Sequence, residues 1–146
     1  MDILLVEDNA TDAELLTEAF RDACTHMPSI TIATDGEAAL KTLRGMPKKP
    51  KLVLLDLNMP KVGGLEVLKE IRQDADPDIN LIPVVILTNS KHPQDVQKAY
   101  ECRCNAFVRK PVGFPKLLRL ARKLHYLWLQ FTLLPHRSTP PPYTPS

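Results

Sequence analysis

Five polar side chains stand directly behind short apolar runs of this sequence: Glu7 and Asp8, Asp56, Thr88, and Lys110. Each run is typical of a parallel-sheet strand that is buried on both faces. Sites in open parallel α/β sheets form just beyond the carboxyl ends of the strands, so these side chains are expected to converge in one crevice. Any one of them could close a strand by chance, because strand ends are ordinarily polar. The joint set predicts a functional site.

The charges of this set predict metal-assisted chemistry. Three carboxylates brought together repel one another and raise each other's pKa, so the arrangement needs compensating cations. Lys110 supplies one positive charge, and an all-oxygen site that keeps several waters suits Mg²⁺ or Mn²⁺. With a metal bound, Asp56 can attack phosphorus as a nucleophile while Lys110 and the metal neutralise the phosphoryl oxygens. Thr88 can donate its hydroxyl to a phosphoryl oxygen once the group is in place.

Five strand–helix repeats are needed to position these groups. Strands are expected at residues 3–6, 30–32, 52–55, 83–87 and 106–109, and helices at 11–24, around 38–43, around 65–71, at 93–103 and at 114–134. Short buried strands that alternate with helices predict an α/β fold, with one parallel sheet, helices on both faces and right-handed crossovers. Thr11 and Glu14 have the spacing of a capping box at the first helix.

The domain organisation follows from the same pattern. We expect one domain over residues 1–134, which includes the long last helix. Residues 135–146 are rich in proline and offer little to bury, so they are expected to be a disordered or extended tail.

Four segments together resemble the response-regulator receiver family. They are LLVEDN (4–9), LLDLNMP (54–60), LTNS (87–90) and RKP (109–111), and they stand in the family's order. The resemblance covers about residues 2–125 and is specific, because four separate motifs agree. It implies a flavodoxin-like, doubly wound sheet of five parallel strands in the order 2-1-3-4-5. It also implies a phosphorelay switch that takes a phosphoryl group from a phosphohistidine of a sensor kinase.

The resemblance assigns roles to individual residues. Asp56 is the expected phosphoacceptor, and Glu7 and Asp8 are expected to bind Mg²⁺ together with Asp56 and the backbone carbonyl of Asn58. Lys110 is expected to contact the phosphoryl group.

Further assignments concern the peptide bond after the lysine and the output of the switch. In this family the bond that precedes Pro111 is usually cis. Thr88 and Phe107 are the expected switch pair, although an aromatic in a fifth strand is also compatible with plain core packing.

Two positions depart from the family's pattern. Many receivers carry Asp-Gly where this chain has Gly63 and Gly64, a change that removes an acid from the turn but leaves the metal ligands intact. After Thr88 the family usually has a small residue, whereas here Asn89 follows. We expect the larger polar side chain to narrow access to Asp56 and to change the lifetime of the phosphoryl group.

The last helix is too apolar for a single buried face. One stripe at helical spacing predicts a core face, and further apolar residues remain unaccounted for. The segment that begins at His125 resembles the C-terminal extension of response regulators that serve phytochromes. That resemblance implies a two-fold homodimer through the fourth helix, the fifth strand and the fifth helix. The candidate dimer or partner surface comprises Leu118, Tyr126, Leu127, Trp128, Leu129 and Phe131. The alternative is that the extension folds back on its own domain.

Charge is distributed unevenly along the chain. Residues 1–90 carry 9 Lys/Arg and 15 Asp/Glu, and residues 91–146 carry 10 and 2, so the halves have net charges of −6 and +8. A basic half can mark an anionic partner, and direct nucleic-acid binding is the alternative of a different class. No helix-turn-helix fits the proline-rich end. A solvated helix face explains the same charges more simply.

Other functional classes fit the sequence less well. A phosphatase with an aspartyl nucleophile needs a further acid close after it, and positions 57–60 are Leu-Asn-Met-Pro. We therefore expect no turnover of an external substrate. The three cysteines have no metal-site spacing and suit a reducing compartment. With no signal-peptide pattern and no long apolar stretch, the expected location is cytoplasmic. A receiver served by a kinase that is not a phytochrome, and a receiver that no longer accepts phosphate, remain alternatives.

Overall fold

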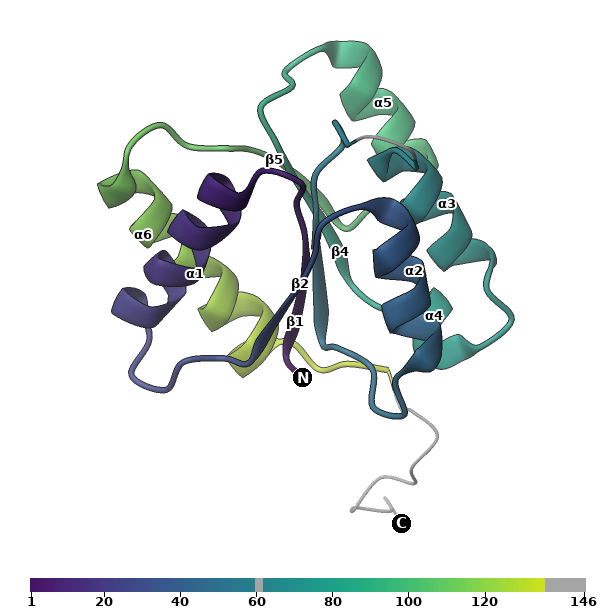
Figure 1. Ribbon diagram of the computed structural model, residues 1–146, viewed down its shortest axis with the longest axis horizontal. Coiled ribbons are helices and arrows are strands. Elements are labelled where there is room, and N and C mark those ends of the chain that lie inside the picture. Colours follow the sequence, from purple (N-terminus) through teal and green to yellow (C-terminus); the bar gives the residue numbers. More distant parts are fainter. Residues whose placement is uncertain (60–61, 136–146) are drawn as a thin grey trace.

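The computed structural model describes residues 1–59 and 62–135, and these form a five-stranded parallel sheet with helices on both faces (Figure 1). The strands are β1 (Ile3–Val6), β2 (Ile30–Ala33), β3 (Leu52–Leu55), β4 (Val84–Thr88) and β5 (Ala106–Arg109). The helices are α1 (Ala10–Ala23), α2 (Gly36–Gly45), α3 (Gly64–Gln73), α4 (Pro77–Asn80), α5 (Pro93–Glu101) and α6 (Phe114–Leu124), with the π-helical η1 (His125–Phe131) after α6. The strand order β2-β1-β3-β4-β5 confirms the predicted fold.

The two faces of the sheet bury two separate hydrophobic clusters. In Figure 1, α1 and α6 cover one face and α2 to α5 cover the other. Side chains alternate between the faces along each strand, so Ile3 and Leu5 of β1 join the α1–α6 cluster while Leu4 and Val6 join the other. Because both faces are covered, β1, β3 and β4 are buried along their whole length, as their continuous apolar runs predict.

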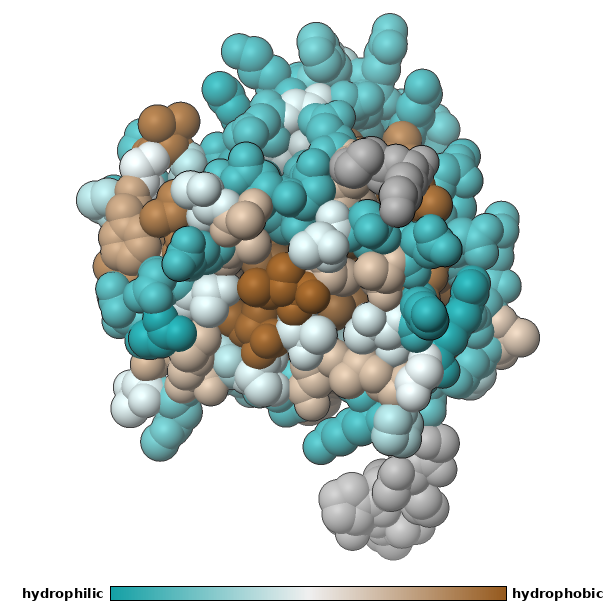
Figure 2. All heavy atoms as spheres, in the orientation of Figure 1, coloured by the Kyte–Doolittle hydropathy of each residue, from teal (hydrophilic) through white to brown (hydrophobic). Residues whose placement is uncertain are grey.

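One edge of the sheet is open to solvent. Among the residues that the structure describes, β2 pairs only with β1. The face shown in Figure 2 has a hydrophobic area at its centre, where β2 lies in the same orientation of Figure 1. Ile32 of this strand is 44% exposed. The remainder of the face is mainly hydrophilic. Within the described ranges, the structure contains no helix with the length and hydrophobicity that crossing a bilayer requires.

One local prediction about a helix start was wrong, and one short helix was not predicted. α1 begins at Ala10 rather than Thr11, and its N-cap is Asn9, whose side chain accepts a hydrogen bond from the Asp12 amide. Asparagine caps a helix at least as well as threonine, so the earlier cap prevails over the capping-box spacing. The short helix α4 was not predicted, although Asp76 as N-cap and Pro77 at its first position are recognisable start signals.

The last helix differs from the prediction of one continuous helix over residues 114–134. The α-helical part ends at Leu124, η1 continues to Phe131, and both the amide and the hydroxyl of Thr132 donate to the Leu127 carbonyl. Residues 132–135 are not helical. Thr132 ends η1, because its two donors satisfy the Leu127 carbonyl, which would otherwise accept from the next residues of a longer helix. The predicted tail beyond Pro135 lies outside the described residues.

The candidate partner surface divides into two parts. Trp128 and Leu129 are partly buried against the α1–α6 cluster, so they have less surface to offer a partner. Tyr126, Leu127 and Phe131 are exposed, and the rings of Tyr126 and Phe131 lie 4.4 Å apart between centroids. The helical period explains the division, because one side of η1 continues the α6 face toward α1 while the other points to solvent.

Candidate functional site

Backbone hydrogen bonds bring the ends of the strands together as predicted. The Asp56 amide donates to the Val6 carbonyl (3.1 Å), and the Lys110 amide donates to the Thr88 carbonyl (2.8 Å). The parallel ladder therefore continues one residue beyond β3 and β5. This register places polar residues from four strands together at the carboxyl ends of those strands.

Three carboxylates form a cluster at these strand ends. Oxygen atoms of Glu7, Asp8 and Asp56 all lie within 4.8 Å of one another. Glu7 and Asp56 are only 4% and 7% exposed, whereas Asp8 is exposed to solvent. Hard oxygen donors with one solvent-facing side suit a divalent cation that retains several waters. The three predicted acidic ligands thus fit divalent metal binding.

The loop after β3 is held against the cluster. The Asn58 amide donates to Asp56 Oδ1 (3.3 Å), which orients the carboxylate. The structure does not test whether the Asn58 carbonyl is a metal ligand, so this assignment stays a prediction.

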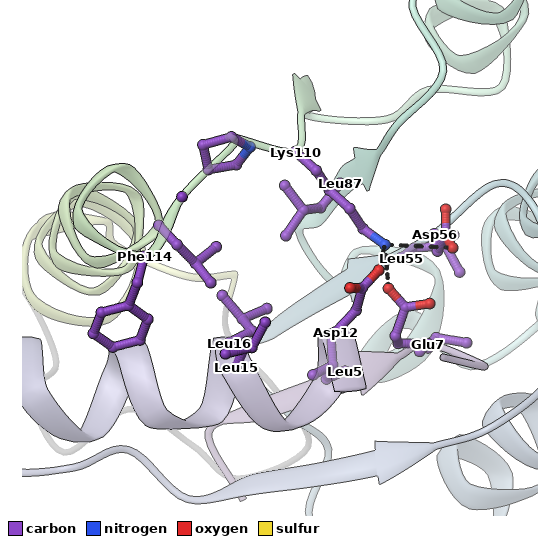
Figure 3. A pocket seen from close by; sticks show the side chains of 14 residues that line it. Leu5, Glu7, Asp12, Leu15, Leu16, Leu55, Asp56, Leu87, Lys110 and Phe114 are labelled. Carbon is purple, nitrogen blue, oxygen red and sulfur yellow. Dashed lines mark hydrogen bonds and ion pairs between the residues drawn. The ribbon is translucent and has the colours of Figure 1, made fainter. Parts of the chain in front are cut away.

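Lys110 is the cation of the site, and its ammonium is shared among carboxylates (Figure 3). It donates to Glu7 and to Asp12 (3.0 Å), and it lies 3.7 Å from Asp56 Oδ2. Burial alone would lower the pKa of Lys110, but the hydrogen bonds to Glu7 and Asp12 and the charge of Asp56 raise it above its usual value. The lysine is therefore fully charged at neutral pH.

Asp12 was missed by the sequence analysis. It lies on α1, not behind a strand, and the contact with Lys110 joins positions that are 98 residues apart. Helical spacing gives no signal for it, because Asp8 precedes the helix that begins at Ala10.

The expected mutual effect of the carboxylates is visible at Glu7. The pKa of Glu7 is raised to about 7, because burial raises it, the hydrogen bond from Lys110 opposes that rise, and the charge of Asp56 adds to it. Desolvation is the largest of these causes, whereas the sequence argument invoked only repulsion between like charges.

The predicted switch residues lie on neighbouring strands. Thr88 is fully buried, and its hydroxyl oxygen accepts a hydrogen bond from the Ser90 amide (3.3 Å). Phe107 is half-buried against the cluster on the α2–α5 face, and its amide donates to the Tyr100 hydroxyl (3.2 Å). No pattern in the sequence indicates this contact from α5. The coupled movement of Thr88 and Phe107 stays a prediction.

Two glycines differ sharply in the room around them. A side chain at Gly64 would overlap the Asp56 carbonyl and the Cα of Leu57, whereas one at Gly63 would meet only the Leu57 carbonyl oxygen, at 3.8 Å. Gly64 therefore lets α3 begin directly against the loop after β3. The departure from Asp-Gly falls on Gly63, where space for a side chain exists.

Other expectations near the site have mixed outcomes. The peptide bond between Lys110 and Pro111 is trans rather than cis. Trans is the form that X–Pro bonds favour intrinsically, by about 0.5–1 kcal/mol. Asn89 is exposed beside Thr88, and its effect on access to Asp56 stays a prediction.

A cavity of about 190 Å³ adjoins the site between α1 and α6 (Figure 3). Its walls are mainly apolar and include Leu16, Leu87 and Phe114. Asp12 and Lys110 line its polar end.

Comparison with known proteins agrees with this geometry. The family model of the response regulator receiver domain matches residues 3–122 of the sequence. The chain is 38% identical over 138 residues to response regulator Rcp1 of Synechocystis sp., covering 91% of this chain and 92% of Rcp1. It is 39% identical over 137 residues to the probable methanogenesis regulatory protein FilR2 of Methanothrix harundinacea, covering 91% of this chain and 86% of FilR2.

Solved structures give the same result. The phosphorylated cyanobacterial phytochrome response regulator RcpA superposes with a TM-score of 0.84 at 34% identity, covering 92% of this chain and 98% of RcpA. The Mn²⁺-bound form of Rcp1 superposes with a TM-score of 0.79 at 37% identity, with the same coverage of the two chains. The chain therefore belongs to the response regulator receiver domain family and is closely related to phytochrome response regulators.

Proposed function

We propose that this chain is the phosphoacceptor of a two-component phosphorelay, and that Asp56 receives the phosphoryl group from a phosphohistidine of a sensor kinase. One observation carries the proposal. A nearly buried aspartate shares a space of 4.8 Å with two further carboxylates and lies 3.7 Å from the Lys110 ammonium. Such a site combines a nucleophile with the groups that neutralise phosphoryl oxygens.

The residues of the site divide the chemistry among them. An Asp56 oxygen attacks phosphorus, the O–P bond forms as the N–P bond to the histidine ring breaks, and the ring leaves with the electron pair. Lys110 donates to a phosphoryl oxygen. The Thr88 hydroxyl accepts from the Ser90 amide, so its own proton is free to be donated to a second phosphoryl oxygen.

A divalent cation, Mg²⁺ or Mn²⁺, would neutralise charge on the phosphoryl group when bound. Glu7, Asp8 and Asp56, with the Asn58 carbonyl, would hold it. The chain would assist its own phosphorylation and dephosphorylation and would not turn over an external substrate.

The proposed output is a change of the surface formed by α5, β5 and α6, the fourth and fifth long helices and the fifth strand. Thr88 moves toward the phosphoryl group and Phe107 turns inward. The same surface, extended by η1, is proposed to form a two-fold homodimer, centred on the exposed side chains of Tyr126, Leu127 and Phe131. Leu118 is half-buried on α6 and would lie at its margin.

The proposed donor is a phytochrome-type histidine kinase. Support comes from the relatives, since RcpA is described as a cyanobacterial phytochrome response regulator and another solved neighbour, at 29% identity and a TM-score of 0.81, acts in red light signalling of R. palustris. Transfer of ³²P from a purified phytochrome-type kinase, compared with a chemotaxis-type kinase, tests this choice. Faster transfer from the second kinase would contradict it.

The central claim is tested with a small phosphodonor. The full chain is incubated with acetyl phosphate and Mg²⁺, and its intact mass and elution volume are measured. We expect a gain of one phosphoryl group in the wild type and none in Asp56→Asn. A wild type that remains unmodified, or a variant that gains the same mass, would overturn the proposal.

A further inference from the structure

The Lys110 ammonium has one partner that neither the metal cluster nor the phosphoacceptor accounts for. Of its three N–H groups, one is donated to Glu7 and one to Asp12 Oδ2 (3.0 Å), while Asp56 Oδ2 stands farther away at 3.7 Å. Asp12 does not belong to the cluster of Glu7, Asp8 and Asp56. Asp12 therefore lies closer to the lysine ammonium than the nucleophile does.

The start of α1 fixes Asp12 in this position. Its amide donates to the Asn9 side chain (3.0 Å), so the N-cap that starts the helix also sets the direction of the Asp12 side chain. An acid in the first turn of a helix is favourable for the helix dipole alone. The helix dipole explains why an acid is favourable at position 12. It does not explain why that acid forms an ion pair with Lys110, the residue that follows β5.

Lys110 is largely withdrawn from solvent, and Asp12 is not. Their side chains are 14% and 36% exposed. Both side chains line the cavity between α1 and α6, so the pair has open space beside it. A change of partner by the lysine needs such space.

We propose that Asp12 is a positioning residue that competes with the phosphoryl group on Asp56 for the Lys110 ammonium. The inference rests on the proposed function and deepens it. When Glu7 turns to a metal ion, Asp12 is the partner that still holds the lysine and offsets its charge. Its own negative charge also opposes the approach of an anionic phosphodonor. Asp12 thereby restrains acceptance and weakens the hold on the bound phosphoryl group.

The variant Asp12→Asn removes the negative charge but keeps a side-chain oxygen that can accept a hydrogen bond from Lys110. It therefore tests the effect of the charge without loss of the contact. With acetyl phosphate and Mg²⁺, we expect the rate constant of phosphorylation to rise about two- to fivefold, and the dissociation constant for beryllofluoride to fall by a similar factor, as for loss of one partly exposed charge contact. Glu14→Gln is the matched control, since it removes a charge from the same helix without contact to Lys110. We expect it to change both quantities less than 1.5-fold, as an order of magnitude for a screened surface charge.

A double-mutant cycle distinguishes this role from a structural one. In a Lys110→Ala background, Asp12→Asn should have no more effect than Glu14→Gln, because the contact it acts through is gone. An equal gain in both backgrounds, or no gain in the wild-type background, would overturn the inference. In the second case, normal phosphorylation of the wild type leaves the proposed function intact. A wild type that accepts no phosphoryl group overturns both.

Discussion

Gly64 leaves the least room beside the phosphoacceptor. Its amide donates to the Leu57 carbonyl (3.1 Å), and a Cβ at this position would overlap the carbonyl of Asp56. Gly64→Ala must push α3 away from the loop after β3. We expect a loss of about 1–3 kcal/mol in the free energy of unfolding, as for other overpacked sites. Urea denaturation measures it, and the rate of phosphorylation by acetyl phosphate should fall as well.

Gly63→Ala is the control for this change. Its backbone has φ of −69°, which any residue adopts, and the new Cβ would lie 3.8 Å from its nearest neighbour. We expect a change within about 0.5 kcal/mol. Equal losses in the two variants would show that close packing against Asp56 is not the reason that residue 64 is glycine.

The free energy of unfolding is expected to fall at acid pH as Asp2 becomes protonated. Partial burial by itself raises the pKa of Asp2, but hydrogen bonds from Ser29 and the nearby Lys51 ammonium outweigh it and hold the pKa below its usual value. Because the folded-state pKa is the lower one, the stabilisation is complete above the unfolded-state pKa and is lost as the pH falls through the folded-state value.

The variant Asp2→Asn should therefore be less stable than the wild type at pH 7, by at most about 1 kcal/mol for so exposed a pair. The difference should shrink when unfolding is measured at pH 3. The control Asp22→Asn removes an exposed acid from α1, and we expect little difference at either pH. A gap between wild type and Asp2→Asn that persists unchanged at pH 3 would contradict the assignment to this carboxylate.

At the scale of residues, the sequence predicts side chains that stand behind strands and misses those that reach the site from elsewhere. Asp56 and Lys110 are found because the end of a buried strand has only one place to be in a parallel sheet. Asp12 and Tyr100 are missed because their contacts depend on how helices pack against the sheet. That packing is set by tertiary structure and leaves no local pattern at either residue.

At the scale of elements, a hydrogen bond connects α5 to β5 at Phe107, the predicted switch residue. β5 is an edge strand, and the Tyr100 hydroxyl accepts the hydrogen bond from the Phe107 amide (3.2 Å) that a further strand would otherwise accept. Tyr100→Phe removes this acceptor and keeps the ring. We expect faster hydrogen exchange at the Phe107 amide and a loss of at most about 1 kcal/mol in stability.

Tyr126→Phe is the matched control, since it removes a hydroxyl from the exposed part of η1. Exchange at the Phe107 amide, followed by NMR, should be unchanged in this variant. If Tyr100→Phe also leaves that rate unchanged, the hydroxyl does not protect the edge of β5.

The elements that were predicted correctly are the strands and the longer helices. Four strands follow from apolar runs, β2 follows from the short segment Ile30-Thr31-Ile32, and the parallel order follows from the alternation of strands with helices. The four-residue helix α4 is too short to show a period. The change from α6 to η1 could not be read either, because apolar residues all around this segment satisfy an α-helical and a π-helical spacing equally well.

At the scale of the whole molecule, the excess of positive charge lies where the proposed dimer forms. α6 contains no acid and carries four exposed cations, Lys116, Arg119, Arg122 and Lys123. A two-fold axis near this helix brings like charges toward each other, so the apolar side chains of η1 must supply the attraction. Nucleic acid binding, the alternative reading of these cations, would instead draw its attraction from them.

Added salt should therefore have opposite effects on self-association and on binding to nucleic acid. Raising NaCl from about 50 mM to about 500 mM shortens the Debye length from roughly 14 Å to roughly 4 Å, which should tighten self-association and abolish binding to duplex DNA. Sedimentation equilibrium of the phosphorylated and unphosphorylated chain measures the first, and fluorescence anisotropy measures the second. Weaker self-association at high salt would show that ion pairs hold the dimer, and tight salt-sensitive DNA binding would favour the alternative.

The apolar centre of the proposed interface is tested by removing it. Leu127→Ser with Phe131→Ser deletes two exposed side chains of η1 and leaves Trp128 and Leu129 packed on α1. Because residues at the centre of an interface typically contribute more than 1 kcal/mol each, we expect the dissociation constant of the dimer to rise at least about tenfold. Leu81→Ser removes a similarly exposed leucine beside α4 and should leave self-association unchanged. Equal weakening by both variants would place the interface elsewhere, whereas the selective loss would tie the output of Asp56 to η1.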